Sequence, residues 1–91
     1  MALSKEKKQH IMKSFGINAE DTGSAQVQVA LLTERITDVT GHLQKNIHDF
    51  SSKRGLLKMV ARRRKILQYL ESTDRALYNT ILQRLELKKI N

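Results

Sequence analysis

Apolar residues recur at helical spacing along most of this chain, and short polar breaks divide the pattern into four segments. The clearest run steps by four and three residues from Ala25 to Leu43, which keeps its apolar side chains on one helix face for about three heptads. No segment alternates with a period of two for long, as a half-buried strand would. The pattern therefore predicts an all-α protein with helices at approximately residues 4–15, 24–44, 50–71 and 74–87.

Helix-starting and helix-ending residues occupy the breaks between these segments. Gly16 follows the first segment, Thr22-Gly23-Ser24 precedes the second and Ser72-Thr73-Asp74 precedes the last. Short connectors between long helices imply antiparallel neighbours, so the second and third helices should form a long hairpin. The predicted fold is an elongated four-helix bundle with a short N-terminal helix. The third helix is expected to face inward with Leu56, Leu57, Val60, Leu67 and Leu70.

The composition fits one small domain spanning residues 1–91. The chain has no Cys, which excludes disulfides and the common thiolate zinc sites. No apolar run approaches the roughly 18 to 20 residues of a membrane span, and the basic N-terminus lacks the apolar stretch of a secretory signal. We expect a cytoplasmic protein that is a monomer when free.

The charge distribution indicates an acidic partner. The formal net charge is +8, and the stretch between Phe50 and Leu70 carries seven Lys or Arg residues and no carboxylate. A helix face of one sign repels itself unless a polyanion neutralises it, and nucleic acid is the usual polyanion. An anionic membrane surface is the second option, but the chain has only two Phe, two Tyr and no Trp to insert into one.

Two polar stripes run beside the apolar positions. Gln28, Arg35 and His42 are seven residues apart, so they lie nearly in line on a helix, over roughly 21 Å. The second stripe lies on the third helix and contains Arg54, Lys58, Arg62, Lys65 and Tyr69. The antiparallel hairpin should bring Tyr69 to the level of Gly23 and Gln28, and place His42 at the other end. Two patches about 20 Å apart on one surface are the result.

Several motifs together resemble one known family, the bacterial small-subunit ribosomal protein fifteen. The matching strings are Asp21-Thr22-Gly23-Ser24, Val27-Gln28-Val29-Ala30-Leu31-Leu32-Thr33, His42-Leu43, Asp49, Ser52, Arg54-Gly55-Leu56-Leu57, Arg62-Arg63-Arg64-Lys65 and Tyr69-Leu70. They cover essentially the whole chain. The resemblance implies a four-helix structural protein, without cofactor or metal, that binds the central domain of 16S rRNA and organises the platform for assembly. It also implies a position near the large subunit.

The resemblance assigns RNA contacts to particular residues of this sequence. A patch that meets a three-way junction matches Thr22, Gly23, Gln28, Arg35 and Tyr69. A patch that meets a G·U/G·C step in the minor groove matches His42, Asp49 and Ser52. The cations expected to meet the phosphate backbone are Arg54, Lys58, Arg62, Arg63, Arg64 and Lys65. The chain departs from the family pattern at Phe50 and Ser51, where two histidines are common.

These residue types suit the minor groove of RNA. An A-form helix displays 2′-hydroxyls there, and guanine alone adds a donor, its N2 amino group. An ionised Asp49 can only accept hydrogen bonds, which matches both donors, while His42 and Ser52 can donate or accept.

Simpler structural roles stay open for several of the same residues. Asp49 can be the N-cap of the third helix, and both roles can coexist only if different oxygens serve them. Thr22 and Ser24 are ordinary cap residues, and Tyr69 can be a half-buried edge of the bundle. Arg35 can pair with Asp38, three residues further along the helix.

Catalysis is not expected from this sequence. There is no Ser, His and acid set, no phosphate-binding loop and no paired carboxylates in an apolar setting. His42 and His48 with Asp49 have no recognised metal-ligand spacing. The remaining alternative is a non-specific helical RNA-chaperone or DNA-binding module that uses the same basic stripe.

Overall fold

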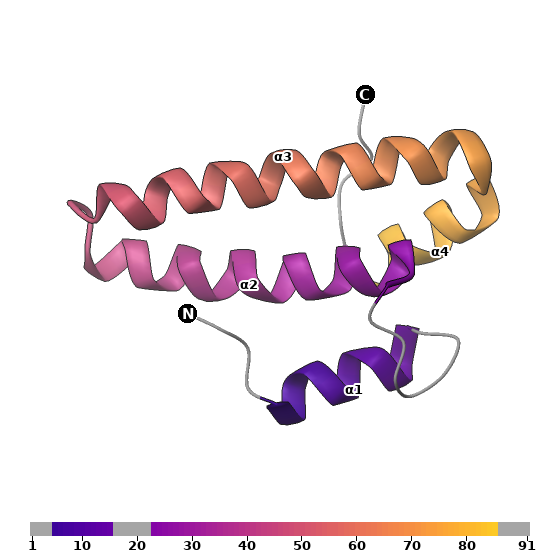
Figure 1. Cartoon of the computed structure of the whole chain (residues 1–91), viewed down its shortest axis with the longest axis horizontal. Coiled ribbons are helices and arrows are strands. Elements are labelled where there is room, and N and C mark those ends of the chain that lie inside the picture. Colours follow the sequence, from indigo (N-terminus) through magenta and orange to yellow (C-terminus); the bar gives the residue numbers. More distant parts are fainter. Residues whose placement is uncertain (1–4, 16–22, 86–91) are drawn as a thin grey trace.

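Four helices make up the parts of the chain that the computed structural model describes, residues 5–15 and 23–85. They are α1 (Lys5–Phe15), α2 (Ala25–Lys45), α3 (Phe50–Thr73) and α4 (Arg75–Arg84). Helices α2 and α3 run antiparallel side by side, α4 folds back beside the end of α3, and α1 lies along α2 (Figure 1). No strand occurs within those residues. The prediction of an all-α bundle built on a long hairpin is confirmed.

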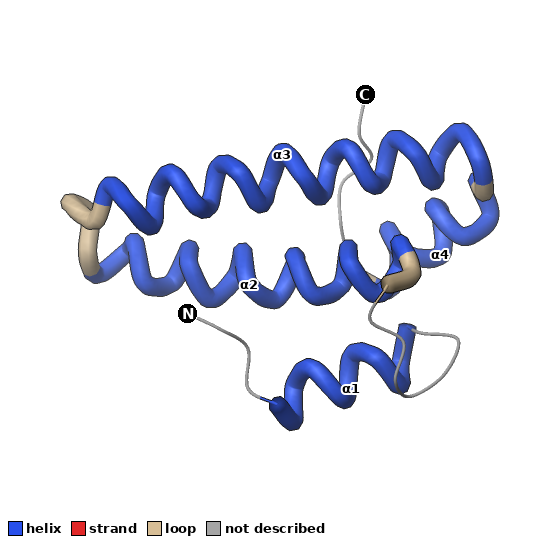
Figure 2. Tube along the Cα trace, in the orientation of Figure 1, coloured by secondary structure: helices blue, strands red, loops and turns tan. Residues whose placement is uncertain are grey.

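Two short connections set this arrangement (Figure 2). Asp49 precedes α3, and its side chain accepts a hydrogen bond from the Ser52 N–H, which satisfies a helix-end donor. Between α3 and α4 a single residue, Asp74, makes the turn. Its N–H donates to the Leu70 carbonyl at 2.8 Å, and its side chain accepts from the Leu77 N–H at 3.2 Å. One residue thus ends one helix and begins the next.

The core consists of two apolar clusters on opposite sides of α2. One cluster joins α2 to α3 and α4 through Val29, Leu67, Leu70, Tyr78, Ile81 and Leu82. The other joins α1 to α2 through Ile11, Met12, Val27, Ala30 and Leu31. Leu85 packs against both clusters. Helix α2 is therefore the central element, and it fixes the positions of α1 and α3 relative to each other.

The prediction that Leu57 and Val60 face inward is wrong. Their exposed fractions are 66% and 39%, whereas Leu67 is only 2% exposed. Leu57 directly follows the half-buried Leu56, so it points about 100° away from it around the helix. Helices α1 and α4 lie along the half of the hairpin away from its connector, so only α2 lies beside the first part of α3 (Figure 1).

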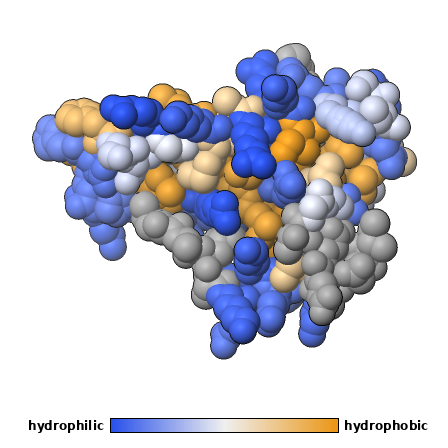
Figure 3. Space-filling model, in the orientation of Figure 1, coloured by the Kyte–Doolittle hydropathy of each residue, from blue (hydrophilic) through white to orange (hydrophobic). Residues whose placement is uncertain are grey.

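The connector end of the hairpin also exposes apolar surface. Ile47 and Phe50 are 63% and 62% exposed, and this end shows apolar side chains beside hydrophilic ones in Figure 3. The Phe50 ring meets the His48 ring edge-on at a centroid distance of 6.1 Å, and the Lys53 ammonium lies 5.8 Å from the Phe50 ring centroid. Phe50 therefore presents an exposed aromatic ring beside a cation at this end of the hairpin.

Candidate nucleic-acid interface

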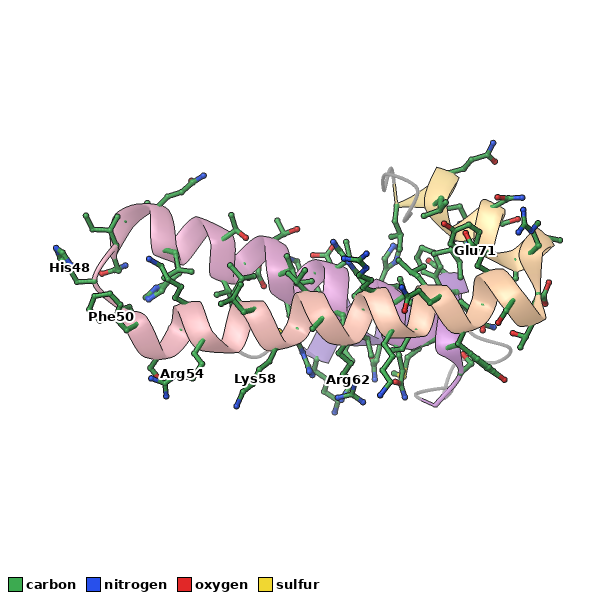
Figure 4. All side chains as sticks on the ribbon, turned by 90° about the horizontal axis from the view of Figure 1, so that it is seen from above. His48, Phe50, Arg54, Lys58, Arg62 and Glu71 are labelled. Atoms are coloured by element: carbon green, nitrogen blue, oxygen red, sulfur yellow. The ribbon has the colours of Figure 1, made fainter. Side chains whose placement is uncertain are left out.

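One side of α3 carries a row of exposed cations. Arg54, Lys58 and Arg62 point to the same side of the helix, and Glu71 lies on the opposite side (Figure 4). Lys65 continues the row and is also exposed. No carboxylate interrupts the helix between Phe50 and Leu70. Side chains of this kind are suited to phosphate groups along a nucleic-acid backbone.

Arg63 differs from the rest of the basic run. It is half-buried against α2, and its Nη1 donates to the Thr33 hydroxyl oxygen at 3.3 Å. Burial lowers the pKa of this guanidinium. Thr33 in turn donates to the Val29 carbonyl at 2.8 Å. The position of Arg63 thus links α3 to α2, which the sequence pattern alone did not indicate.

His42, Asp49 and Ser52 form one hydrogen-bonded cluster at the connector end, as the sequence led us to group them. Asp49 Oδ2 accepts from Ser52 Oγ at 2.7 Å and lies 2.8 Å from His42 Nε2, while Asp49 Oδ1 accepts from the Ser52 N–H at 3.0 Å. The two hydrogen bonds from Ser52, the backbone one first, and the one from His42 lower the pKa of Asp49 to about 2. Asp49 is therefore an ionised N-cap.

Asn46 also belongs to this cluster, although its sequence position did not predict it. Its Nδ2 lies 3.4 Å from His42 Nδ1 and donates to the His42 carbonyl at 3.0 Å. An amide N–H can only donate, so Nδ1 is the acceptor and the imidazole proton lies on Nε2, facing Asp49. The spacing of four residues between His42, in the last turn of α2, and Asn46, the residue that caps its end, was a signal that could have identified this contact.

A second group of predicted residues lines a hollow at the other end of the hairpin. Gly23, Gln28 and Tyr69 meet there with Lys65, Ala25 and Ile66, around a volume of about 340 Å³. The Tyr69 ring is 55% exposed, so it is accessible at the rim and is not part of the core. Thr22, assigned to the same patch, lies outside the described residues. Ser24 holds the N-cap position of α2 and makes no side-chain capping hydrogen bond.

Arg35 lies in a neighbouring hollow together with Lys8, Arg62 and Gln28. Its Nε is buried and has no hydrogen-bond partner. No ion pair joins it to Asp38 within the described part of the chain, where Glu34 on the same helix instead lies 3.6 Å from the Lys7 ammonium. Gln28 lines both hollows, so it connects the positions of Tyr69 and Arg35.

The two ends of this surface are held at a fixed separation by α2. Gln28, Arg35 and His42 lie on one continuous α-helix at intervals of seven residues, so they share one side of it. The distance from Gln28 to His42 along the axis is about 21 Å. In residues 5–15 and 23–85 we find no group of three or more potential metal-ligating side chains. None of the described helices is long and apolar enough to span a membrane.

A basic helical hairpin with a polar patch at each end defines a small nucleic-acid-binding protein. Comparison with known protein families gives a match over most of the chain: residues 7–88 match the family Ribosomal protein S15. The chain is 51% identical over 88 residues to small ribosomal subunit protein uS15 of Synechococcus sp. (strain RCC307), covering 97% of this chain and 99% of that protein. It is 52% identical over 89 residues to uS15 of Chloroflexus aurantiacus (strain ATCC 29366 / DSM 635 / J-10-fl), covering 98% and 100%.

This chain belongs to the ribosomal protein S15 family, and the resemblance seen in its motifs is confirmed. It is a structural constituent of the small ribosomal subunit, and it binds 16S rRNA as part of that particle. The protein is accordingly ribosome-bound in the cytoplasm. The family is one of structural proteins and not a known class of enzyme.

Proposed function

We propose that the protein binds a three-way junction in the central domain of 16S rRNA and reads a neighbouring G·U/G·C step in the minor groove. The junction residues are Thr22, Gly23, Gln28, Arg35 and Tyr69, and the minor-groove residues are His42, Asp49 and Ser52. The cations of α3 hold the intervening backbone. Binding at two sites fixes the angle between RNA helices and so prepares the platform for later proteins, which it contacts through the RNA.

The cluster around Asp49 is the observation that carries this proposal. Its internal hydrogen bonds use the Ser52 hydroxyl proton and the His42 Nε2 proton. The atoms left to meet a ligand are acceptors, namely the remaining lone pairs of the Asp49 carboxylate and of Ser52 Oγ. Acceptors complement the guanine N2 amino group and 2′-hydroxyls, whereas they repel phosphate oxygens.

The opposite end of the hairpin has the chemistry that a junction requires. An exposed ring such as that of Tyr69 can stack on a ribose or an unpaired base. Lys65, in the same hollow, supplies a charge for the backbone. The separation of about 21 Å set by α2 lets one rigid surface contact both RNA elements at once. We further propose that the protein is a monomer before assembly and contributes to a bridge with the large subunit.

Competition binding tests this function against non-specific binding. Labelled central-domain RNA is bound at constant salt and challenged with an unlabelled three-way junction that contains the G·U/G·C step, or with a plain RNA duplex of equal length. The proposal expects the junction to compete at concentrations orders of magnitude lower than the duplex. Equal competition by the two RNAs would instead support a general RNA-chaperone or DNA-binding module. Chemical footprinting of the same RNA then locates both contacts.

A further inference from the structure

Exposed apolar side chains gather on the connector half of the hairpin. They are Ile47, Phe50, Leu57 and Val60, and the described residues hold one other large apolar side chain that is exposed, Tyr69 near the far end of α3. Single exposed apolar residues are ordinary on a protein surface, whereas a group of them marks a contact surface. Helix α2 is the only helix beside this part of α3 (Figure 1), and it leaves these side chains uncovered.

Three of these residues form a seam along α3. Phe50 and Leu57 are seven residues apart on this helix, so they lie within about 20° of each other around its axis. Val60 follows Leu57 by three residues and lies about 60° further around. Steps of seven and three residues are those of the a and d positions of packed helices, where each apolar side chain enters a space between residues of the facing helix. We call Phe50, Leu57 and Val60 the α3 seam.

Cations border the α3 seam. Arg54 and Lys58 project from one side of α3 (Figure 4), about 60° and 100° around the axis from Leu57. The Lys53 ammonium lies 5.8 Å from the Phe50 ring centroid, and α3 has no carboxylate before its last turn. Two copies of this surface would repel each other, so the seam is unsuited to self-association. A complementary surface is apolar in the middle and acidic at the edges.

We propose that the α3 seam binds an amphipathic α-helix of another protein, with apolar residues along its centre and Asp or Glu residues along its edges. Helix recognition of this kind uses apolar anchors at helical spacing, as Phe50, Leu57 and Val60 provide. RNA presents phosphates, hydroxyls and base rings, on which Phe50 could stack, but it offers no aliphatic surface to Leu57 and Val60. This partner goes beyond the proposed function, because the seam contains none of the residues assigned to the junction or the minor groove.

The length of the α3 seam indicates the strength of the interaction. From Phe50 to Val60 it extends over about 15 Å, or about three helical turns. Such a contact is at the small end of the range of protein interfaces, where transient complexes occur. We therefore expect a micromolar affinity that depends on both the apolar centre and the acidic edges of the partner helix.

A synthetic peptide of about three heptads is the probe for this surface. It carries Leu at positions a and d, Glu at positions e and g and a fluorophore at one end, and repulsion between its Glu residues disfavours self-pairing. One control peptide has the same composition in scrambled order, and the other has Lys in place of Glu. Fluorescence anisotropy should show saturable binding of the designed peptide and about tenfold weaker binding of both controls. Equal binding of the scrambled peptide would show attraction by net charge alone and overturn the proposal.

Substitution of Leu57 tests the seam itself, with a conservative change as the matched control. The side chain is exposed, so neither Leu57→Gln nor Leu57→Met should disturb the fold, which thermal unfolding checks. We expect Leu57→Gln to weaken binding of the designed peptide by about tenfold and Leu57→Met by less than about twofold. Equal affinities for the two variants would contradict an apolar contact at this position.

RNA binding by the same variants separates this proposal from the proposed function. Leu57→Gln should bind central-domain RNA as the wild type does. A loss of RNA affinity as large as its loss of peptide affinity would assign the seam to RNA and overturn the proposal. A wild-type protein that fails to prefer the junction refutes the proposed function and leaves the peptide measurements to decide the seam.

Nuclear magnetic resonance locates the bound peptide, and two further assays test other occupants. Backbone amide signals of Phe50, Leu57 and Val60 should shift on addition of the designed peptide, while those of Gln28 and Arg35 should not. Shifts confined to Gln28 and Arg35 would place the peptide on the RNA-facing side of α2 and overturn the proposal. So would a dimer of the free protein, detected by sedimentation equilibrium, or binding to phosphatidylglycerol vesicles, if either disappeared in Leu57→Gln.

Discussion

His42 Nε2 lies 2.8 Å from Asp49 Oδ2, and this hydrogen bond joins the last turns of α2 to the residue that caps α3. The same carboxylate accepts two hydrogen bonds from Ser52, one at each oxygen. Oδ1 accepts the capping hydrogen bond and Oδ2 accepts from Ser52 Oγ and His42, so the carboxylate lone pair left for RNA lies on Oδ1, beside the cap. The geometry of the cluster is built into the helix hairpin before any RNA arrives.

The first prediction concerns Asp49→Asn. The amide can still cap α3 through its oxygen, but its NH₂ group replaces the oxygen that accepts from Ser52 Oγ and His42. We expect binding to the junction RNA to weaken by about 1 to 3 kcal/mol, with no change for a plain duplex. Filter binding or fluorescence anisotropy at one fixed salt concentration measures both affinities.

Asp74→Asn is the matched control for that experiment. Asp74 also caps a helix through one carboxylate oxygen, and it lies at the α3–α4 turn, far along the hairpin from His42. Junction binding by Asp74→Asn should equal that of the wild type. If both variants lose the same affinity, the loss reflects a weaker helix start and not the minor-groove contact.

The second prediction is a pH dependence of stability. The pKa of Asp49 falls from 3.8 to about 2 on folding, so the folded state binds fewer protons than the unfolded state between these values. Its stabilising contribution is then complete above about pH 4 to 5 and is lost as the pH falls toward 2. Urea unfolding followed by circular dichroism should show a larger free energy of unfolding for the wild type than for Asp49→Asn. This difference should narrow as the pH falls across the range. A difference independent of pH contradicts the pKa shift.

The third prediction separates Lys58 from Arg63. Lys58→Ala should leave the folded protein intact, weaken all RNAs alike and reduce the salt slope by about one. Arg63→Ala should destabilise the fold by about 1 kcal/mol, because it removes the buried stem and the hydrogen bond to Thr33. Thermal unfolding and a salt series on each variant provide the measurements. If Arg63→Ala reduced the salt slope by about one and left stability unchanged, Arg63 would be a phosphate-binding residue and not a structural one.

The fourth prediction tests the exposed part of α3. Leu57→Ala should change the free energy of unfolding by less than about 0.5 kcal/mol, because the side chain is 66% exposed. Leu67→Ala, at 2% exposure in the cluster that joins α2, α3 and α4, should cost about 2 to 5 kcal/mol. Denaturant unfolding gives both values. A large loss from Leu57→Ala would show that another surface covers it in solution.

The sequence was sufficient for the helical fold class, the hairpin and the grouping of His42 with Asp49 and Ser52. These features depend on local spacing: apolar positions at three and four residues, cap residues at the breaks, and a short connector that forces antiparallel packing. The row of cations on one side of α3 follows from the same periodicity. So does the alignment of Gln28, Arg35 and His42 along α2.

Only the tertiary structure decided which side chains from separate helices share a site. Leu57 and Val60 match the apolar pattern but are exposed, because periodicity does not indicate how wide a face of a helix its neighbours cover. Lys8 is one lysine among several in the N-terminal segment until α1 packs on α2 and places it beside Arg35 and Arg62. Such contacts depend on how helices distant in the chain are oriented, and that orientation comes from packing of the whole core.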